Sequence, residues 1–133
     1  MPETINVALI GYRFMGKAHS NAYRQVSRFF DIPVEPVMKV ICGRDEKAVT
    51  EAGKKLGWQE AATDWRQVIA RPDIGLVDVA TGNDTHAEIA IAAAKAGKHV
   101  LCEKPLALNA AQAKQMVQAV RQAGVKHMVC FNY

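Results

Sequence analysis

The sequence has little of what builds a secreted, membrane-bound or metal-binding protein. It contains three cysteines, Cys42, Cys102 and Cys130, and an odd number at such wide spacing suits neither a disulfide framework nor a zinc site. It also lacks an apolar run long enough to cross a bilayer and a signal peptide at its N-terminus. We therefore expect reduced thiols, a cytoplasmic protein, no membrane partner and no metal.

Concentrated charge is missing as well. Lysine and arginine are scattered, the net charge is only +4, and 23% of the residues are charged. Without a basic cluster, nucleic acid is not an expected partner, and a small anionic ligand suits the modest positive excess better. Hydrophobic residues make up 50% of the chain, which is typical of a folded domain and not of a disordered segment.

What is present is a regular alternation of strand-like and helix-like segments. Strands are expected at residues 5–10, 34–42, 74–80, 99–102 and 126–131, and helices at about 15–28, 46–56, 65–70, 86–95 and 110–123. Thr85 with Glu88, and Asn109 with Gln112, are spaced as the N-terminal caps of the last two helices. The alternation predicts an α/β fold with a doubly wound parallel sheet, as one domain over residues 1–133.

The first strand ends in a turn that is suited to phosphate. Gly11 to Gly16 leads directly into a helix, whose N-terminus favours an anion. The usual fingerprint is G-x-G-x-x-G, and here Arg13 replaces the middle glycine. Arg13 could point outward and lend charge to the phosphates, or it could block the site. A third interpretation is that Gly11 and Gly16 serve only turn geometry and packing.

The end of the second strand bears on the choice of cofactor. An acid is expected about 20 residues after the first glycine to bind the adenosine ribose, and a simple count reaches Asp31. Asp31 lies before the second strand, so we reject it in favour of Gly43 and Arg44 at the strand's end. Glycine followed by arginine suits a 2′-phosphate, which favours NADP over NAD, although Arg44 could also be a solvated charge. Asp45 is expected to be a helix cap.

Four motifs occur in a specific order. They are GYRFMGKAH at residues 11–19, ATGNDTH at 80–86, EKPL at 103–106 and FNY at 131–133. In this order and spacing they resemble the N-terminal domain of the glucose–fructose oxidoreductase, inositol dehydrogenase and rhizopine-catabolism (Gfo/Idh/MocA) family, over essentially the whole chain. The resemblance implies a Rossmann domain of an NAD(P)-dependent oxidoreductase whose second, substrate-binding α/β domain is absent from this chain.

The resemblance also implies roles for individual residues. Lys104 corresponds to the family's catalytic-site lysine, which bonds the reacting hydroxyl or carbonyl oxygen, and Pro105 is often a cis proline. Glu103 would contact the nicotinamide ribose region, while Asn83 and His86 would line the nicotinamide side of the cleft. With the glycine turn and the second strand, the predicted cofactor contacts are Gly11, Arg13, Phe14, Met15, Gly16, Arg44, Thr81, Asn83, His86, Glu103, Lys104, Pro105 and Asn132.

The chemistry of hydride transfer agrees with these roles. The hydroxyl proton must leave as the carbonyl forms, and an ammonium beside that oxygen stabilises the developing negative charge. The plainer interpretations are that Lys104 is a surface lysine and that His86 is a solvated residue of a first helical turn. His19 is expected to be structural or exposed.

Three functions stay open at this point. The leading one is an enzyme domain that oxidises or reduces a sugar, a polyol or a related hydroxyl compound, and this chain alone would bind the dinucleotide without turnover. The second is a non-catalytic binding or assembly module in which Arg13 has impaired the phosphate turn. A methyl-transferring enzyme is the weakest, because it has no use for the Glu103-Lys104-Pro105 motif. We also expect a homo-oligomer, since a large apolar docking surface seldom stays bare.

Overall fold

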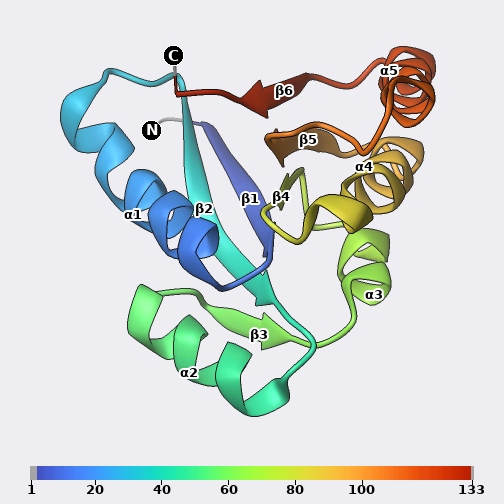
Figure 1. The fold of residues 1–133 in the computed structure, drawn as a ribbon. Helices are drawn as coiled ribbons and strands as arrows, with labels where there is room; N and C mark the ends of the chain where they lie inside the picture. The colour runs from blue at the N-terminus through green and yellow to red at the C-terminus, as the bar shows by residue number, and fades with distance from the viewer. Residues whose placement is uncertain (1–2, 133) are drawn as a thin grey trace.

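Six parallel strands form one sheet that separates two layers of helices (Figure 1). The computed structural model describes residues 3–132; residues 1, 2 and 133 lie outside the described range. The strands follow the order β3-β2-β1-β4-β5-β6 across the sheet, which is that of a Rossmann fold and confirms the predicted doubly wound topology. Their bounds are β1 Glu3–Ile10, β2 Val34–Cys42, β3 Glu60–Ala62, β4 Leu76–Val79, β5 His99–Glu103 and β6 His127–Cys130.

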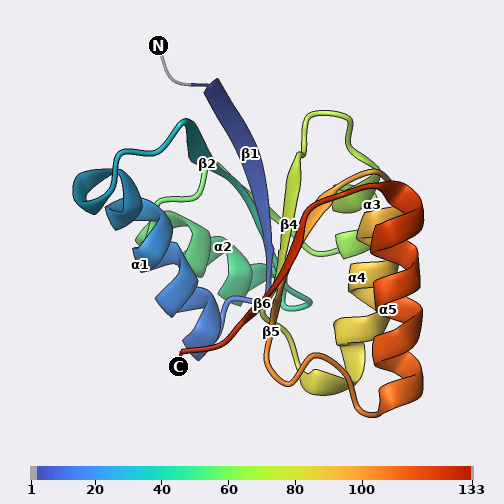
Figure 2. The same ribbon diagram turned by 90° about the horizontal axis from the view of Figure 1, so that it is seen from above.

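The helices are divided between the two faces of the sheet. Helices α1 and α2 cover one face and α3, α4 and α5 cover the other, as Figure 2 shows. Their bounds are α1 Phe14–Phe29, α2 Glu46–Leu56, α3 Trp65–Ala70, α4 His86–Lys95 and α5 Ala110–Ala123, with a short 3₁₀ helix over Asn83–Thr85. Within residues 3–132, none of these helices is both long and apolar enough to cross a membrane.

Alternate residues of β1 supply the two halves of the core. Val7 and Leu9 pack towards α1 and α2, whereas Ala8 and Ile10 pack towards α3, α4 and α5, because successive side chains of a strand point to opposite faces. All four side chains are almost completely buried. The central strand is therefore apolar on both sides, as expected for a parallel sheet with helices on both faces.

Two local predictions need correction. Strand β3 was not predicted, because it has only three residues, begins with the exposed Glu60 and is too short to show any periodicity. The predicted cap formed by Thr85 and Glu88 is wrong, since the Thr85 hydroxyl donates to the Gly82 carbonyl (2.8 Å) and Glu88 pairs with Arg66. The second predicted cap is confirmed, because the Asn109 side chain accepts a hydrogen bond from the Gln112 N–H at 2.9 Å.

Candidate functional site

The glycine turn explains why one glycine of the fingerprint is replaceable and two are not. Gly11 has a φ of +110°, and a Cβ there would lie 2.3 Å from the Ala80 carbonyl oxygen. A Cβ on Gly16 would lie 2.3 Å from the Gly11 carbonyl oxygen. Arg13 has a φ of −77°, which any residue adopts, and its side chain is exposed. The backbone at Arg13 therefore tolerates a side chain, and that side chain is accessible to solvent.

The N-terminus of α1 is open to an anion. Helices α2, α3 and α5 each begin with a side chain that accepts a backbone N–H, from Asp45, Asp64 and Asn109 respectively. In the described part of the chain no side chain caps α1, and its first turn holds no acidic residue. Since the first N–H groups of a helix lack partners within the helix, those of α1 fit a phosphate.

The end of β2 packs directly against the glycine turn. A Cβ on Gly43 would lie only 2.2 Å from Cδ1 of the Tyr12 ring, so glycine allows that ring to rest on the strand. Arg44 is exposed just beyond it. Asp45 caps α2 by accepting the Ala48 N–H at 2.8 Å, as predicted.

His86 joins the loop after β4 to the loop after β5. The imidazole is fully buried, with Nδ1 2.8 Å from the Pro105 carbonyl oxygen and Nε2 3.1 Å from the Thr81 carbonyl oxygen. The interpretation of His86 as a solvated residue is therefore wrong. Its position gives it a role that the sequence analysis did not predict, namely the linkage of the two loops that carry Asn83 and Lys104.

The Glu103-Lys104-Pro105 segment places one exposed ammonium at the end of β5. The Lys104 side chain is exposed, and its backbone N–H donates to Glu103 Oε2 at 3.1 Å. The Lys104–Pro105 peptide bond is cis, as the resemblance implied. Glu103 itself is buried, and both of its carboxylate oxygens contact groups of the protein.

A polar cluster that the sequence analysis missed lies beneath these loops, between α1 and the sheet. The His19 imidazole is held between two carboxylates: Nδ1 is 2.8 Å from Asp78 Oδ2, and Nε2 is 2.8 Å from Glu103 Oε1. The Tyr23 hydroxyl also donates to Asp78 Oδ2 at 2.8 Å. Asp78 is fully buried in β4, between Val77 and Val79 in the sequence, whose side chains point to the opposite face of the sheet. The prediction of His19 as structural or exposed thus overlooked a specific contact with the Glu103 motif.

The two carboxylates hold a proton on His19. The hydrogen bond to Asp78 is the largest cause, and with the charge of Asp78 and the contact with Glu103 it outweighs burial and raises the pKa of His19 from 6.5 to about 9. Burial and the neighbouring Asp78 also raise the pKa of Tyr23. Because both acceptors are carboxylate oxygens, the doubly protonated imidazolium is the form that donates from both ring nitrogens.

The raised pKa predicts how stability depends on pH. Between pH 6.5 and about 9 the folded chain keeps the His19 proton that the unfolded chain releases. His19 therefore contributes fully below pH 6.5, and we expect about 2 kcal/mol of the unfolding free energy to be lost as the pH rises through 9. Urea titrations at several pH values measure this loss. The titratable groups of the cluster around His19 are Tyr23, Asp78, Glu103 and Cys130. His19→Gln is the control, because glutamine does not titrate. An equal loss of unfolding free energy in that variant would contradict the assignment to His19.

The same cluster contains a set of potential metal ligands. One atom each of His19, Glu103 and Cys130 lies within 4.8 Å of the others. Two ligand atoms of a tetrahedral zinc ion would be about 3.3 Å apart, whereas His19 Nε2 and Glu103 Oε1 are 2.8 Å apart, which is a hydrogen-bond distance. Burial also raises the pKa of the Cys130 thiol to about 12. The arrangement is that of a hydrogen-bonded cluster.

The structure brings most of the predicted site residues together at the carboxyl ends of the parallel strands. The ends of β1 and β2 meet through Tyr12 and Gly43, and the ends of β4 and β5 meet through His86. Phe14 is 79% exposed at the start of α1. Asn132 is exposed after β6. The predicted start of a further segment at Tyr133 lies outside the described residues.

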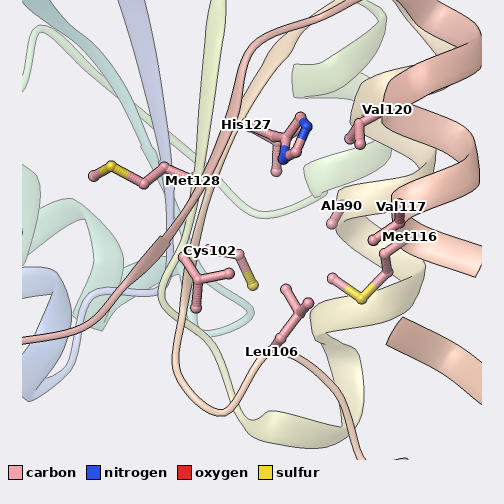
Figure 3. A pocket seen from close by; sticks show the side chains of 10 residues that line it. Ala90, Cys102, Leu106, Met116, Val117, Val120, His127 and Met128 are labelled. Carbon is pink, nitrogen blue, oxygen red and sulfur yellow. The ribbon is translucent and has the colours of Figure 1, made fainter. Parts of the chain in front are cut away.

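A separate hollow lies on the other face of the sheet. Figure 3 shows it between α4, α5 and β6, lined by residues that include Leu106, Met116 and Met128. Its lining is almost entirely apolar, with His127 as its one ionisable group besides Cys102. It therefore offers little to a diphosphate, and the candidate cofactor site remains the edge above α1.

Comparisons with known proteins identify the family and the fold. Residues 5–131 match the oxidoreductase family with an NAD-binding Rossmann fold. Levoglucosan dehydrogenase of Pseudarthrobacter phenanthrenivorans is 50% identical over 132 residues, 98% of this chain and 34% of that relative. Myo-inositol 2-dehydrogenase of Thermotoga maritima is 31% identical over 128 residues, 96% of this chain and 36% of that relative.

Solved structures give the same result. Levoglucosan dehydrogenase in complex with NADH matches with a TM-score of 0.96 at 50% identity, over 98% of this chain and 36% of that one. Biliverdin reductase of Synechocystis in complex with biliverdin and NADP⁺ matches with a TM-score of 0.80 at 30% identity, over 94% of this chain and 37% of that one. The chain spans about a third of the length of the curated relatives it matches. It belongs to the Gfo/Idh/MocA oxidoreductase family and has that family's NAD-binding Rossmann fold.

Proposed function

We propose that residues 1–133 are the cofactor-binding domain of a longer, two-domain dehydrogenase. The reaction is hydride transfer between NAD(P) and a hydroxyl group of a sugar or polyol. The family match and the dehydrogenases among the relatives support this proposal. The observation that carries it is the position of Lys104, an exposed ammonium at the same sheet edge as the open N-terminus of α1.

Each end of the site would have a separate task. Gly11, Gly16 and the first N–H groups of α1 would hold the diphosphate, and Arg13 would add positive charge beside it. When bound, the nicotinamide supplies or accepts the hydride. The Lys104 ammonium would hold the substrate oxygen and stabilise its negative charge while the hydroxyl proton passes to a base of the second domain and the carbon–hydrogen bond breaks. Asn83 and Thr81, on the loop tied down by His86, would flank the nicotinamide side.

Titration with NADH and NADPH tests the cofactor proposal. Saturation with a cofactor at a hundred times its Kd should raise the unfolding free energy by about 2.7 kcal/mol. A dehydrogenase activity with levoglucosan, myo-inositol or related polyols should follow in the full-length natural protein. If neither cofactor binds and Arg13→Gly creates affinity, the domain is instead the non-catalytic module considered above.

The choice between the two cofactors depends on Arg44. We propose that its guanidinium, exposed beyond Gly43, pairs with the 2′-phosphate of NADP and gives a modest preference for that cofactor. Arg44→Ala should then weaken NADPH binding about tenfold and leave NADH binding within about twofold. Fluorescence titration of both reduced cofactors measures this. Equal effects on the two, or none, would leave Arg44 as a solvated charge.

Two further proposals concern the setting of the protein. We propose a cytoplasmic location, because the described range includes all three cysteines and each is a free thiol. We also propose self-association of the full-length protein, since Met128 and Phe131 on and after the edge strand β6 are 63% and 70% exposed. Sedimentation of the natural protein tests the second proposal, and a monomer at micromolar concentration would exclude it.

A further inference from the structure

The hydrogen bonds of the cluster beneath the site form a series that runs from the middle of the sheet to Lys104. Asp78 lies deep in β4, His19 lies between α1 and the sheet, and Glu103 lies at the end of β5. Each hydrogen bond in this series leads nearer to Lys104, whose backbone N–H is the last donor at 3.1 Å from Glu103 Oε2. A continuous series of contacts therefore joins the middle of the sheet to the backbone of the proposed catalytic lysine.

Packing alone does not require such a series. The sequence neighbours of Asp78, Val77 and Val79, point to the opposite face of the sheet, and beside Asp78 on the α1 face lies Leu9 of β1, which is apolar and fully buried. A carboxylate in such a place is costly unless it is paired, and here His19 and Tyr23 pair with it. Tyr23 partners Asp78 only, whereas His19 reaches onward to Glu103. The second contact of His19 is the one that packing does not explain.

We propose that His19 is a positioning residue for Lys104. Its imidazolium, anchored on Asp78, holds the Glu103 carboxylate where that carboxylate accepts the Lys104 N–H. The inference rests on the proposed function, because it gives Lys104 its catalytic role. His19 touches neither substrate nor cofactor, and acts only through Glu103.

The reason for such a support lies in Lys104 itself. Its side chain is exposed and long, so its reach depends on where its backbone is held. Misplacement of a reacting group by about 1 Å can cost about a hundredfold in rate. The Glu103 carboxylate is the only side-chain partner of the Lys104 backbone N–H among the described residues, and His19 orients that carboxylate.

Three variants of the full-length natural protein separate positioning from general stability. His19→Leu breaks both contacts, and His19→Gln keeps one amide donor for Glu103 without the charge. Tyr23→Phe is the matched control, because it removes the other hydrogen bond to Asp78 and leaves the contact with Glu103. The first two readouts are kcat with a polyol substrate and the Kd of NADH. The third is hydrogen exchange of the peptide over residues 103–108, which is measured without cofactor.

We expect His19→Leu to lower kcat about a hundredfold and to speed exchange of the 103–108 peptide about tenfold, with the Kd of NADH changed less than threefold. His19→Gln should recover part of both losses. Tyr23→Phe should change kcat and the exchange rate less than twofold. If His19→Leu does not fold, the comparison of His19→Gln with Tyr23→Phe supplies the same test.

Equal losses of kcat in the His19 and Tyr23 variants would overturn the inference, as would an unchanged exchange rate of the 103–108 peptide in both His19 variants. Failure of the proposed function looks different. In that case the wild-type protein turns over no polyol, while the exchange measurements still decide whether His19 holds the Glu103-Lys104 segment.

Discussion

Lys104→Met in the full-length natural protein is expected to lower kcat about a thousandfold, with the Kd of NADH changed less than threefold. Methionine keeps most of the length of the side chain and removes the charge that would stabilise the substrate oxygen. The change lies in an exposed side chain, so the fold should be unaffected. Steady-state kinetics with a polyol and fluorescence titration of NADH measure the two quantities.

Lys95→Met is the matched control for the Lys104 variant. Lys95 is an exposed lysine in the last turn of α4, which leads to the start of β5 and not to the carboxyl ends of the strands. It should leave kcat within about twofold. A Lys104→Met protein with near-normal kcat would show that another group stabilises the substrate oxygen, and the proposed role of Lys104 would then be abandoned.

Gly11→Ala is expected to have the largest effect on the fold and on cofactor affinity together. The new methyl group would lie 2.3 Å from the Ala80 carbonyl oxygen, on a backbone with a φ of +110°. Backbone strain and the clash add, so we expect a loss of about 4 kcal/mol in unfolding free energy. Because this residue begins the phosphate turn, NADH affinity should fall at least about a hundredfold, as measured by titration at a temperature where the variant is folded.

Gly97→Ala is the control for Gly11→Ala, because it introduces backbone strain from a positive φ without a steric clash. Gly97 also has a positive φ, of +76°, but a Cβ there would meet nothing within 4 Å. Its substitution should cost only about 1 kcal/mol and leave NADH binding unchanged. Urea denaturation of both variants gives the comparison. Equal destabilisation would mean that the close approach of Gly11 to Ala80 relaxes readily.

The backbone features of the candidate cofactor site could be predicted from the sequence because they lie within short stretches. The turn from Gly11 to Gly16 and the segment from Glu103 to Pro105 are each contiguous, and the positions of the strands placed them at one edge. Even the replacement of the middle glycine has a local reason, since Arg13 has an ordinary negative φ. The cap at Asn109 was likewise predictable from four consecutive residues.

The cluster around His19 could not be predicted in the same way. Its contacts join residues 59 and 84 positions apart in the sequence, and the pairing depends on how α1 packs on the sheet. One signal was available, because Asp78 is a carboxylate inside a strand that is otherwise apolar. A buried strand tolerates such a residue only beside a partner, and that partner has to be a donor on the covering helix. The sequence of α1 offers several donors, and only the packing of the helix shows that His19 and Tyr23 are the two that pair with Asp78.

The failure of the Thr85 cap has a similar origin. The spacing of Thr85 and Glu88 fits a cap, but Arg66 of α3 competes for the Glu88 carboxylate, and the Gly82 carbonyl competes for the Thr85 hydroxyl. The local pattern could not reveal either competitor, since one lies on another helix and the other depends on the conformation of the loop.

The link made by His86 also bears on how this domain can change during evolution. Both atoms that His86 contacts are carbonyl oxygens of the main chain, at Thr81 and Pro105. Any amino acid offers such an oxygen, so the side chain at position 81 can diverge without breaking the link, whereas position 105 holds the proline of the cis peptide bond. Position 86 has no such freedom, because both contacts come from its imidazole ring, so we expect substitutions there to be tolerated least.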